Sequence, residues 1–269
     1  MSSIEAIILG IVQGLTEFLP VSSSGHLAIG KALFGIETAD LSFEIVVHAA
    51  TVLATIVVFW KDIWKLLSGL FKFKMNSETR YIILILISMI PVFIVGMFFK
   101  DKVESIFGSG LMVVGLALIV TAMLLFLSEV ITARRAAQSE GEKGGKVTWK
   151  SALWMGLAQA VAVIPGLSRS GSTIATGLLC GVSRNEVARF SFLMVLVPIL
   201  GEAFLDIVGG GFGESTVGTL PLILGFVAAF VSGLFACRFM IAIVKKARLK
   251  WFAVYCAIVG LACLISTMV

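Results

Sequence analysis

The stretch Glu17–Leu27, EFLPVSSSGHL, collects chemically competent side chains inside a largely apolar region. A carboxylate, Glu17, precedes three consecutive serines, Ser22–Ser24, and a histidine, His26, follows them. A carboxylate inside an apolar membrane segment is expensive to bury and marks a functional candidate. Histidine titrates near neutrality and can act as a nucleophile, a base or an acid. These residue types predict proton transfer or nucleophilic attack. The plainer alternatives are that Glu17 only neutralises a cation and that His26 only supports the fold.

A second polar stretch, PGLSRSGST at 165–173, adds a permanent positive charge. Arg169 offers a forked set of donors that suits phosphate oxygens. Serines and glycines that lead into a new helix, near Gly25 and near Gly171, present free backbone N–H groups to an anion. The two stretches together predict a site for an anionic ligand, either phosphate or diphosphate.

The rest of the chain has the composition of a polytopic membrane protein. Of its 269 residues, 59% are apolar and only 14% are charged, whereas soluble domains are about one quarter charged. Backbone groups in lipid must bond internally, so we expect helices; a membrane barrel would show short alternating strands instead. The apolar segments predict an all-α fold with six full spans, at Phe43–Trp60, Tyr81–Phe99, Leu111–Leu127, Phe190–Val208, Leu220–Val244 and Trp251–Met268.

Positive charge lies in alternate connections between these segments. One group of four connections holds 16 Lys and Arg residues, and the connections that alternate with them hold 3. This asymmetry predicts that the four basic connections face the cytoplasm. They are Lys61–Arg80, Ser128–Lys150, Ser183–Arg189 and Lys245–Lys250. Basic residues placed beside membrane helices meet anionic lipid headgroups. The net charge of +5 therefore points to membrane lipids as partners and not to nucleic acid.

Two further apolar segments are interrupted in the middle. The segment Trp149–Ser183 begins and ends in cytoplasmic connections, so its break at Pro165–Gly171 predicts a re-entrant helix hairpin. The segment Ile4–Phe34 has the same layout and must enter from the outside. Its first arm, Ile4–Leu19, reaches only about 24 Å as a helix, which is short of a full crossing.

The two breaks match each other at an offset of 146 residues. The offset pairs Gly10 with Gly156, Gln13 with Gln159, Ser22 with Ser168, Ser24 with Ser170 and Gly25 with Gly171, while Ser23 falls opposite Arg169. The chain is therefore predicted to be one integral membrane domain with an inverted-topology repeat, each half a re-entrant hairpin plus three transmembrane helices. Repeat 1 covers about 1–127, a cytoplasmic loop about 128–150 and repeat 2 about 151–269. The two breaks are then expected to meet near the centre of the membrane.

Two other polar pairs lie one helical turn apart, Glu44 with His48 and Glu202 with Asp206. A polar contact between helices, or a position near the membrane interface, explains each pair adequately. We therefore do not assign these pairs to the chemistry.

On these residues the sequence resembles the undecaprenyl-diphosphate phosphatase family, also called the bacitracin-resistance proteins. QGLTEFLPVSSSGH (13–26) is similar to the family's (E/Q)-x-x-x-E motif and histidine. PGLSRSGST (165–173) is similar to its P-G-x-S-R-S-x-x-T motif, and GVSRNEVARFSFL (181–193) is also family-like. The resemblance extends from Ser3 to the C-terminus.

The resemblance implies an enzyme of the bacterial plasma membrane. It would hydrolyse undecaprenyl diphosphate to undecaprenyl phosphate and inorganic phosphate, and so recycle the lipid carrier for cell-wall synthesis. A site that opens to the outer face and a homodimer are also implied. The residues with implied catalytic roles are Glu17, Ser23, His26 and Arg169. Those implied to bind the phosphate are Ser22, Ser24, Gly25, Gly166, Ser168, Ser170 and Thr173.

Family members use a divalent cation, Mg²⁺ or Ca²⁺, so the resemblance also implies a metal at Glu17, with Gln13 nearby. Gln13 stands where many relatives have glutamate, which leaves one formal charge fewer for a cation. This difference argues against strong direct coordination of the metal.

Two mechanisms and a second function stay open. Either Ser23 attacks the terminal phosphorus with His26 as its base, or His26 attacks directly, while Glu17 orients the histidine or binds the ion. The alternative function is a transporter or flippase for an anionic or phosphorylated lipid, because secondary carriers share inverted repeats with broken helices. The density of reactive side chains at the two breaks favours the enzyme.

Overall fold

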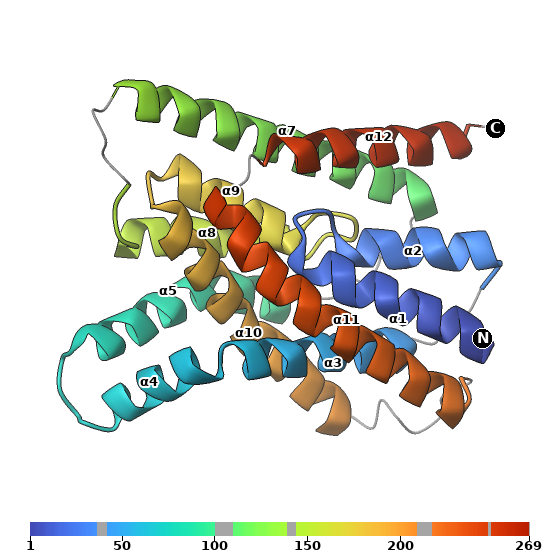
Figure 1. Cartoon of the computed structure of the whole chain (residues 1–269), viewed down its shortest axis with the longest axis horizontal. Coiled ribbons are helices and arrows are strands. Elements are labelled where there is room, and N and C mark those ends of the chain that lie inside the picture. Colours follow the sequence, from blue (N-terminus) through green and yellow to red (C-terminus); the bar gives the residue numbers. More distant parts are fainter. Residues whose placement is uncertain (37–41, 100–109, 139–143, 209–216, 247–248, 269) are drawn as a thin grey trace.

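The computed structural model describes residues 1–36, 42–99, 110–138, 144–208, 217–246 and 249–268, with only the backbone at 138, 202–208 and 245–246. Within these ranges the chain forms helices and no β-strand, which confirms the all-α class (Figure 1). The predicted pair Glu202 and Asp206 has its side chains outside the described residues.

The helices fall into two sets of similar order. The first set is α1 (Ser3–Phe18), α2 (Ser23–Phe34), α3 (Ser42–Val58), α4 (Trp60–Leu70), α5 (Ser77–Phe98) and α7 (Gly110–Gln138). The second set is α8 (Trp149–Val161), α9 (Arg169–Leu179), α10 (Arg184–Val208), α11 (Thr219–Lys246) and α12 (Lys250–Ser266). Each set opens with two helices of at most 16 residues around a break, and the helices that follow have 17–29 residues, except the 11-residue α4. This order agrees with the two predicted halves, while their inverted orientation stays a prediction.

Local chemistry explains both breaks. Helix α1 ends before Pro20, because Leu19 has extended backbone angles and the residue preceding a proline disfavours the helical conformation. Helix α2 then begins with Ser22 as its N-cap, and α9 begins in the same way with Ser168. In Figure 1 the α1–α2 hairpin runs in from the end of the molecule that holds both termini, and the α8–α9 hairpin from the opposite end.

Three helices are long and apolar enough to cross a membrane among the described residues, Ser77–Phe98, Gly110–Ala137 and Thr219–Val244. A fourth crossing results if α3 and α4, bent by 72° at Phe59, count as one span. Helix α3 covers nearly all of the predicted segment Phe43–Trp60, and the bend lies at the end of that segment, with α4 in the connection that follows it. The predicted total of six spans is not reached by length and composition among the described residues, since α12 has only 17 residues and α10 is not among the helices that qualify.

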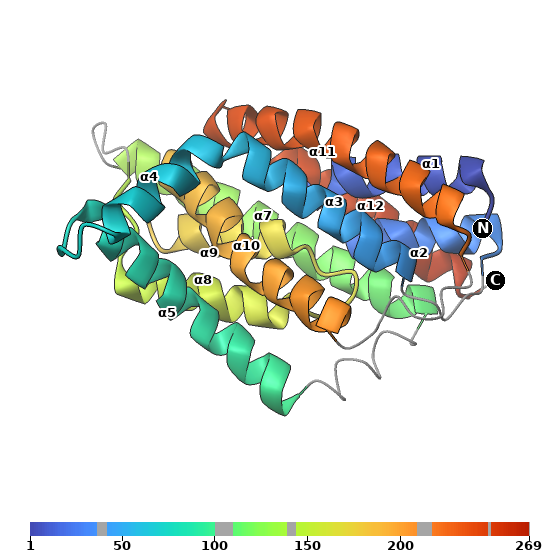
Figure 2. The same cartoon turned by 90° about the horizontal axis from the view of Figure 1, so that it is seen from below.

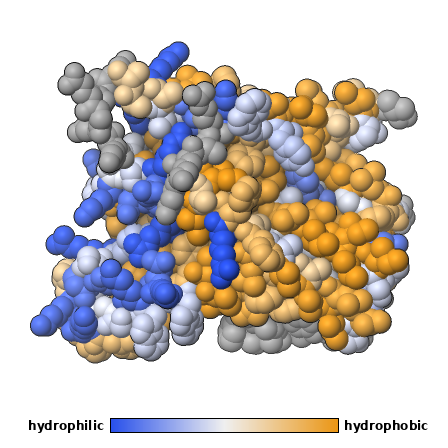
Figure 3. Space-filling model, in the orientation of Figure 1, coloured by the Kyte–Doolittle hydropathy of each residue, from blue (hydrophilic) through white to orange (hydrophobic). Residues whose placement is uncertain are grey.

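The surface is divided between an apolar belt and one hydrophilic end. Figure 3 shows hydrophobic residues over most of the visible face and hydrophilic residues gathered at the end where α4 meets α5, where α7 ends and where α8 begins. The exposed basic residues of these connections are Lys61, Lys65, Lys72, Lys74, Arg80, Arg134, Arg135, Lys146 and Lys150. They belong to connections predicted to face the cytoplasm, so the charge pattern of the sequence is reproduced as one charged end of the fold.

Close helix crossings hold the first hairpin in place. Helix α1 packs along α11, and Figure 2 shows the two side by side near the N-terminus. Gly10 on α1 faces Gly225 on α11 so closely that a Cβ atom at Gly10 would meet the Gly225 carbonyl group and lie 3.0 Å from the Ala228 Cβ atom. Small residues at such a crossing let two backbones approach and gain van der Waals contact, which drives helix association in lipid.

We predict that Gly10→Ala destabilises the fold by about 1–3 kcal/mol, because the added methyl group overpacks this crossing. Unfolding of the detergent-solubilised protein by heat or denaturant measures the change. The control is Gly96→Ala, where an added Cβ has nothing within 4 Å and alanine is the better helix former. Equal stability of the two variants would contradict a tight α1–α11 contact.

Candidate active site

The two breaks lie against each other, as the sequence predicts. The Ser170 hydroxyl donates to the Leu19 carbonyl at 3.1 Å, and the Gly166 N–H donates to the Ser24 hydroxyl at 3.3 Å. Each bond joins residues more than 140 positions apart in sequence. Irregular backbone from one hairpin is thus partly satisfied by polar groups of the other, which is what buried backbone in an apolar surrounding requires.

The serines that begin α2 and α9 make matching caps. Ser22 Oγ accepts from the Gly25 N–H at 3.2 Å, and Ser168 Oγ accepts from the Gly171 N–H at 3.1 Å. The two helix N-termini, with their partial positive charge, therefore end at the junction of the breaks. Ser22 has a φ of 70°, a left-handed conformation that is uncommon for a non-glycine residue. Such strain persists only where surrounding structure enforces it.

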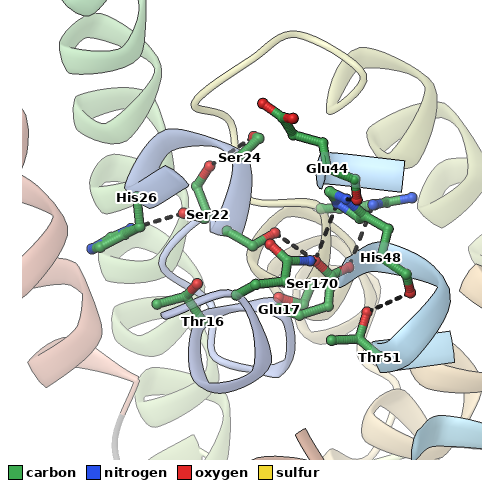
Figure 4. A network of polar contacts seen from close by, with 12 residues as sticks. Thr16, Glu17, Ser22, Ser24, His26, Glu44, His48, Thr51 and Ser170 are labelled. Atoms are coloured by element: carbon green, nitrogen blue, oxygen red, sulfur yellow. Dashed lines mark hydrogen bonds and ion pairs between the residues drawn. The ribbon is translucent and has the colours of Figure 1, made fainter. Parts of the chain in front are cut away.

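Glu17 lies at the centre of the polar contacts (Figure 4). Its carboxylate is 8% exposed. Its Oε2 atom accepts from Ser23 Oγ–H at 2.5 Å and from Gln13 Nε2 at 2.9 Å. Its Oε1 atom lies 3.4 Å from Arg169 Nη2. A buried carboxylate stays ionised only if donors and opposite charge replace the water it has lost, and residues of both breaks provide them here.

Arg169 and Glu17 border a narrow cavity between the hairpins and two longer helices. Its polar lining comes from Ser170 on α9, from Thr51 and Thr55 on α3, and from Ser191 on α10, and the rest of its lining is apolar. The apolar residues there are Phe18, Val52, Phe192, Val195, Leu196 and Ile199. Charged, hydroxyl and apolar side chains thus share the lining of one small cavity.

The structure does not bring His26 to this group. Its Nδ1–H donates to the Ser22 carbonyl at 2.8 Å, so Nε2 is free to accept from the Tyr255 hydroxyl at 2.7 Å. The ring stacks on Tyr255 of α12 at 5.6 Å between centroids. Figure 4 shows the ring turned away from Glu17. The bond to Ser22 turns the imidazole toward α12, and the expected catalytic role of His26 beside Ser23 stays a prediction.

The other predicted phosphate-binding residues divide by their contacts. Ser24 and Ser170 join the breaks, as described above. Gly25 and Gly166 allow the two breaks to approach, since a Cβ at Gly25 would lie 3.3 Å from Gly166 Cα. Gly166 also has a φ of 86°, a conformation that favours glycine. The Thr173 hydroxyl is buried and donates to the carbonyls of Arg169 and Ser170 within α9.

One residue of the cluster was set aside in the sequence analysis. His48 Nε2 lies 3.7 Å from Glu17 Oε2 on α1, and the Glu44 carboxylate pairs with Lys31 of α2. Both are polar contacts between helices, one of the two explanations expected for this pair. The sequence gives one hint that His48 belongs to a polar cluster, because it lies on the same helix face as Glu44 and Thr51. The neighbouring residues do not show that this face packs on α1.

The side-chain oxygens near Glu17 could hold a divalent cation only together with a ligand. Among the described residues no group of three or more His, Cys, Asp or Glu side chains is arranged to hold a metal. Next to Glu17, the Gln13 Oε1 atom is buried and has no hydrogen-bond partner. Mg²⁺ is commonly held by one or two carboxylates together with substrate phosphates and water. The residues here fit a cation that is shared with a phosphate ligand, and they do not build a closed protein cage.

We predict that Glu17 and Arg169 are energetically coupled. The variants Glu17→Ala, Arg169→Ala and the double variant should give a coupling of about 1–3 kcal/mol in the free energy of unfolding, since each single change leaves the other charge unpaired. The control pair is Lys65 and Glu78, 3.8 Å apart with Lys65 68% exposed, whose coupling should be too small to detect. Additive losses at Glu17 and Arg169 would show that no such pair joins the breaks.

Known proteins match this chain over nearly its whole length. The family described as bacitracin resistance protein BacA matches residues 6–262. Relatives named undecaprenyl-diphosphatase include one from Bacteroides thetaiotaomicron, 59% identical with 100% of both chains covered, and one from Parabacteroides distasonis, 60% identical over 100% of this chain and 99% of the relative. A relative of the same name from Carboxydothermus hydrogenoformans is 38% identical over 98% of this chain and 97% of its own. The match includes both breaks and the helices around them, and the chain therefore belongs to the bacitracin resistance protein BacA family of multi-pass membrane proteins.

Proposed function

We propose that this protein hydrolyses undecaprenyl diphosphate to undecaprenyl phosphate and inorganic phosphate. The relatives named undecaprenyl-diphosphatase, at up to 60% identity, support the activity. The observation that carries it is the contact of Glu17 with Ser23 and Arg169 where the two breaks meet. A base, a hydroxyl nucleophile and a phosphate-binding cation are thereby gathered in one place, and Glu17 and Arg169 also border a cavity that has apolar residues in its lining.

Phosphoryl transfer asks a protein mainly for positioning and for stabilisation of charge on the phosphoryl oxygens. Arg169 is 25% exposed beside the cavity, and its guanidinium has donors that Glu17 does not use. The N-termini of α2 and α9 add backbone N–H groups and positive dipole ends at the same place. Together they bind the diphosphate and stabilise the transition state, as fixed donors do for other developing oxyanions.

Ser23 is the nucleophile that the geometry favours. Its hydroxyl already donates to Glu17 Oε2, so as Ser23 Oγ attacks the terminal phosphorus its proton passes to that carboxylate. The P–O bond to undecaprenyl phosphate breaks, and the lipid phosphate leaves with the bond's electron pair. Water then attacks the phosphoserine, releasing inorganic phosphate and returning the serine hydroxyl. Direct attack by His26 would first require the ring to leave Tyr255 and Ser22.

A divalent cation, Mg²⁺ or Ca²⁺, is proposed to be recruited together with the diphosphate. Glu17 and the unpartnered Gln13 Oε1 are the side-chain oxygens that would hold it. When bound, it would neutralise phosphate charge, and this is the one contribution that we assign to it.

The architecture proposed for the membrane is an inverted-topology repeat with six full spans and a site that opens to the outer face of the bacterial inner membrane. Its support is the matched capping of the two breaks, the like order of helices in both halves and the concentration of basic residues at one end. A homodimer is proposed on the family resemblance alone.

We expect purified protein in detergent to release phosphate from undecaprenyl diphosphate, with Arg169→Ala lowering the rate about 10²–10³-fold. Arg169→Lys should recover only part of this loss, since a point charge cannot replace a forked donor set. A phosphate-release assay measures both. A transporter cannot act in detergent, so a folded wild-type protein that releases no phosphate would favour the carrier. Full activity of folded Arg169→Ala protein would defeat the assigned role.

We also expect a transient phosphoserine at Ser23. Acid quenching during turnover of substrate labelled in its terminal phosphate should trap label on the enzyme, and peptide mapping should locate it at Ser23. Ser23→Ala should remove the label and slow turnover by at least about 10³-fold. Label on His26 would replace Ser23 as the nucleophile, and the absence of label at every quench time would leave direct attack by water.

A further inference from the structure

We infer that Tyr255 of α12 is a positioning residue of this site and that it acts through His26. The Tyr255 hydroxyl lies 2.7 Å from His26 Nε2, and the same imidazole bonds the backbone directly before Ser23, the proposed nucleophile. Tyr255 lies outside the sequence motifs, and the proposed mechanism gives the motif histidine no part. The inference rests on the proposed function, because its consequence is a Ser23 hydroxyl held where it can attack the phosphorus.

The hydrogens along this series of contacts can be assigned from its inner end. His26 Nδ1 lies 2.8 Å from the Ser22 carbonyl oxygen, which can only accept, so Nδ1 carries the ring hydrogen. In the neutral ring Nε2 then has a lone pair, and the Tyr255 hydroxyl donates to it. A donor therefore faces an acceptor at both contacts, and neither contact needs an ionised group.

The Ser22 carbonyl belongs to the peptide group that joins Ser22 to Ser23. It accepts from the His26 backbone N–H at 3.2 Å as well as from the imidazole, so both of its lone pairs are used. Figure 4 shows the ring bonded back to Ser22. The left-handed φ of 70° at Ser22 needs surrounding contacts that enforce it, and the imidazole is one of them. Rotation of this peptide group would move the Ser23 hydroxyl relative to Glu17 Oε2, which lies 2.5 Å away.

Tyr255 stands on a helix that packs directly against the first break. Its neighbour Cys256 is fully buried, and the thiol lies 3.5 Å from the Pro20 carbonyl oxygen. Further along α12, Gly260 lies so close to α7 that a Cβ atom there would be 2.8 Å from the Gly115 carbonyl oxygen. These contacts fix α12 relative to the break, so the Tyr255 hydroxyl is a fixed anchor for the imidazole.

The effect on catalysis follows from the two ends of the imidazole. Without the Tyr255 hydroxyl the ring is held only at the Ser22 carbonyl, and it can turn about its side-chain bonds. The peptide group before Ser23 is then less firmly held. A misplacement of about 1 Å can cost about 10²-fold in rate, so a partial loss of order should slow the chemical step. Diphosphate binding depends on Arg169 in the proposed mechanism, and it should change little.

The first test removes one hydroxyl and keeps the aromatic ring. We expect Tyr255→Phe to lower kcat about tenfold and to leave KM within about threefold of the wild type, because Ser23 is misplaced while the phosphate-binding groups remain. The control is Tyr81→Phe, the same change at the other tyrosine of the chain. The Tyr81 hydroxyl is buried and has no hydrogen-bond partner among the described residues, so this variant should leave both constants unchanged.

Steady-state phosphate release and a melting curve for each variant supply these readings. Wild-type kcat in folded Tyr255→Phe protein would show that the imidazole needs no anchor on α12. A rise in KM alone would make Tyr255 a substrate contact. Either result overturns the inference.

A second variant tests whether the imidazole works through the backbone. His26→Asn places an amide N–H about where Nδ1 lies, so it keeps a donor for the Ser22 carbonyl and loses the contact with Tyr255. We expect it to be about tenfold slower than the wild type, and we expect the double variant with Tyr255→Phe to be no slower than either single variant. Losses that multiply in the double variant would show that the two residues act separately. A loss as large as that of Ser23→Ala would show that the imidazole itself takes part in the chemistry, and both results contradict the positioning role.

A spectroscopic measurement separates failure of this inference from failure of the proposed function. The chain has two histidines, so protein made with ¹⁵N-labelled histidine gives signals from two imidazoles, and His48→Gln assigns them. At mildly alkaline pH the Nε2 signal of His26 should move downfield in Tyr255→Phe, as an unprotonated ring nitrogen does when it loses a hydrogen-bond donor. It should stay in place in Tyr81→Phe. If the wild-type protein releases no phosphate, the phosphatase assignment fails and this signal still tests the contact. An unchanged signal in Tyr255→Phe would sink the inference whatever the enzyme's activity.

Discussion

Backbone broken inside an apolar surrounding must find its hydrogen-bond partners within the protein, and the rest of this structure depends on that constraint. Each break here begins a new helix with a serine cap, Ser22 in one case and Ser168 in the other. The remaining polar groups turn to the opposite break, where Ser170 bonds to Leu19 and Gly166 to Ser24. The same groups that make the breaks tolerable therefore bring two distant parts of the chain to one point.

That point also allows a carboxylate to be buried. Glu17 is 8% exposed, and it is surrounded by Arg169 from the second half of the chain and by Gln13, Ser23 and His48 from the first. Removal of any charged partner would leave an uncompensated charge, so stability and chemistry depend on the same contacts. A hydroxyl that donates to a buried carboxylate beside an arginine is also an arrangement prepared for phosphoryl transfer.

The two halves contribute different chemistry from equivalent positions. At the offset of 146, Ser23 lies opposite Arg169, and Glu17 lies opposite Val163. In the proposed mechanism the first break supplies the nucleophile and its base, whereas the second supplies the cation. The capping serines are the same in both halves, since both helices must be started in the same way. Backbone requirements have kept the breaks alike while their functional side chains differ.

The sequence by itself determined the elements and the motifs. Hydropathy identified the apolar helices, Pro20 and the glycines and serines placed the breaks, and the two stretches around Glu17 and Arg169 were recognisable as one anion site. These features depend on neighbours within a few residues, or on a repeat that can be read along the chain. Only the tertiary structure decided what each histidine contacts, because the packing of α3 on α1 brings His48 to Glu17, while His26 meets Ser22 and Tyr255. It likewise decided that the chain continues after α3 as a second helix, α4, at an angle of 72°, since hydropathy reports burial in lipid and not the direction of a helix.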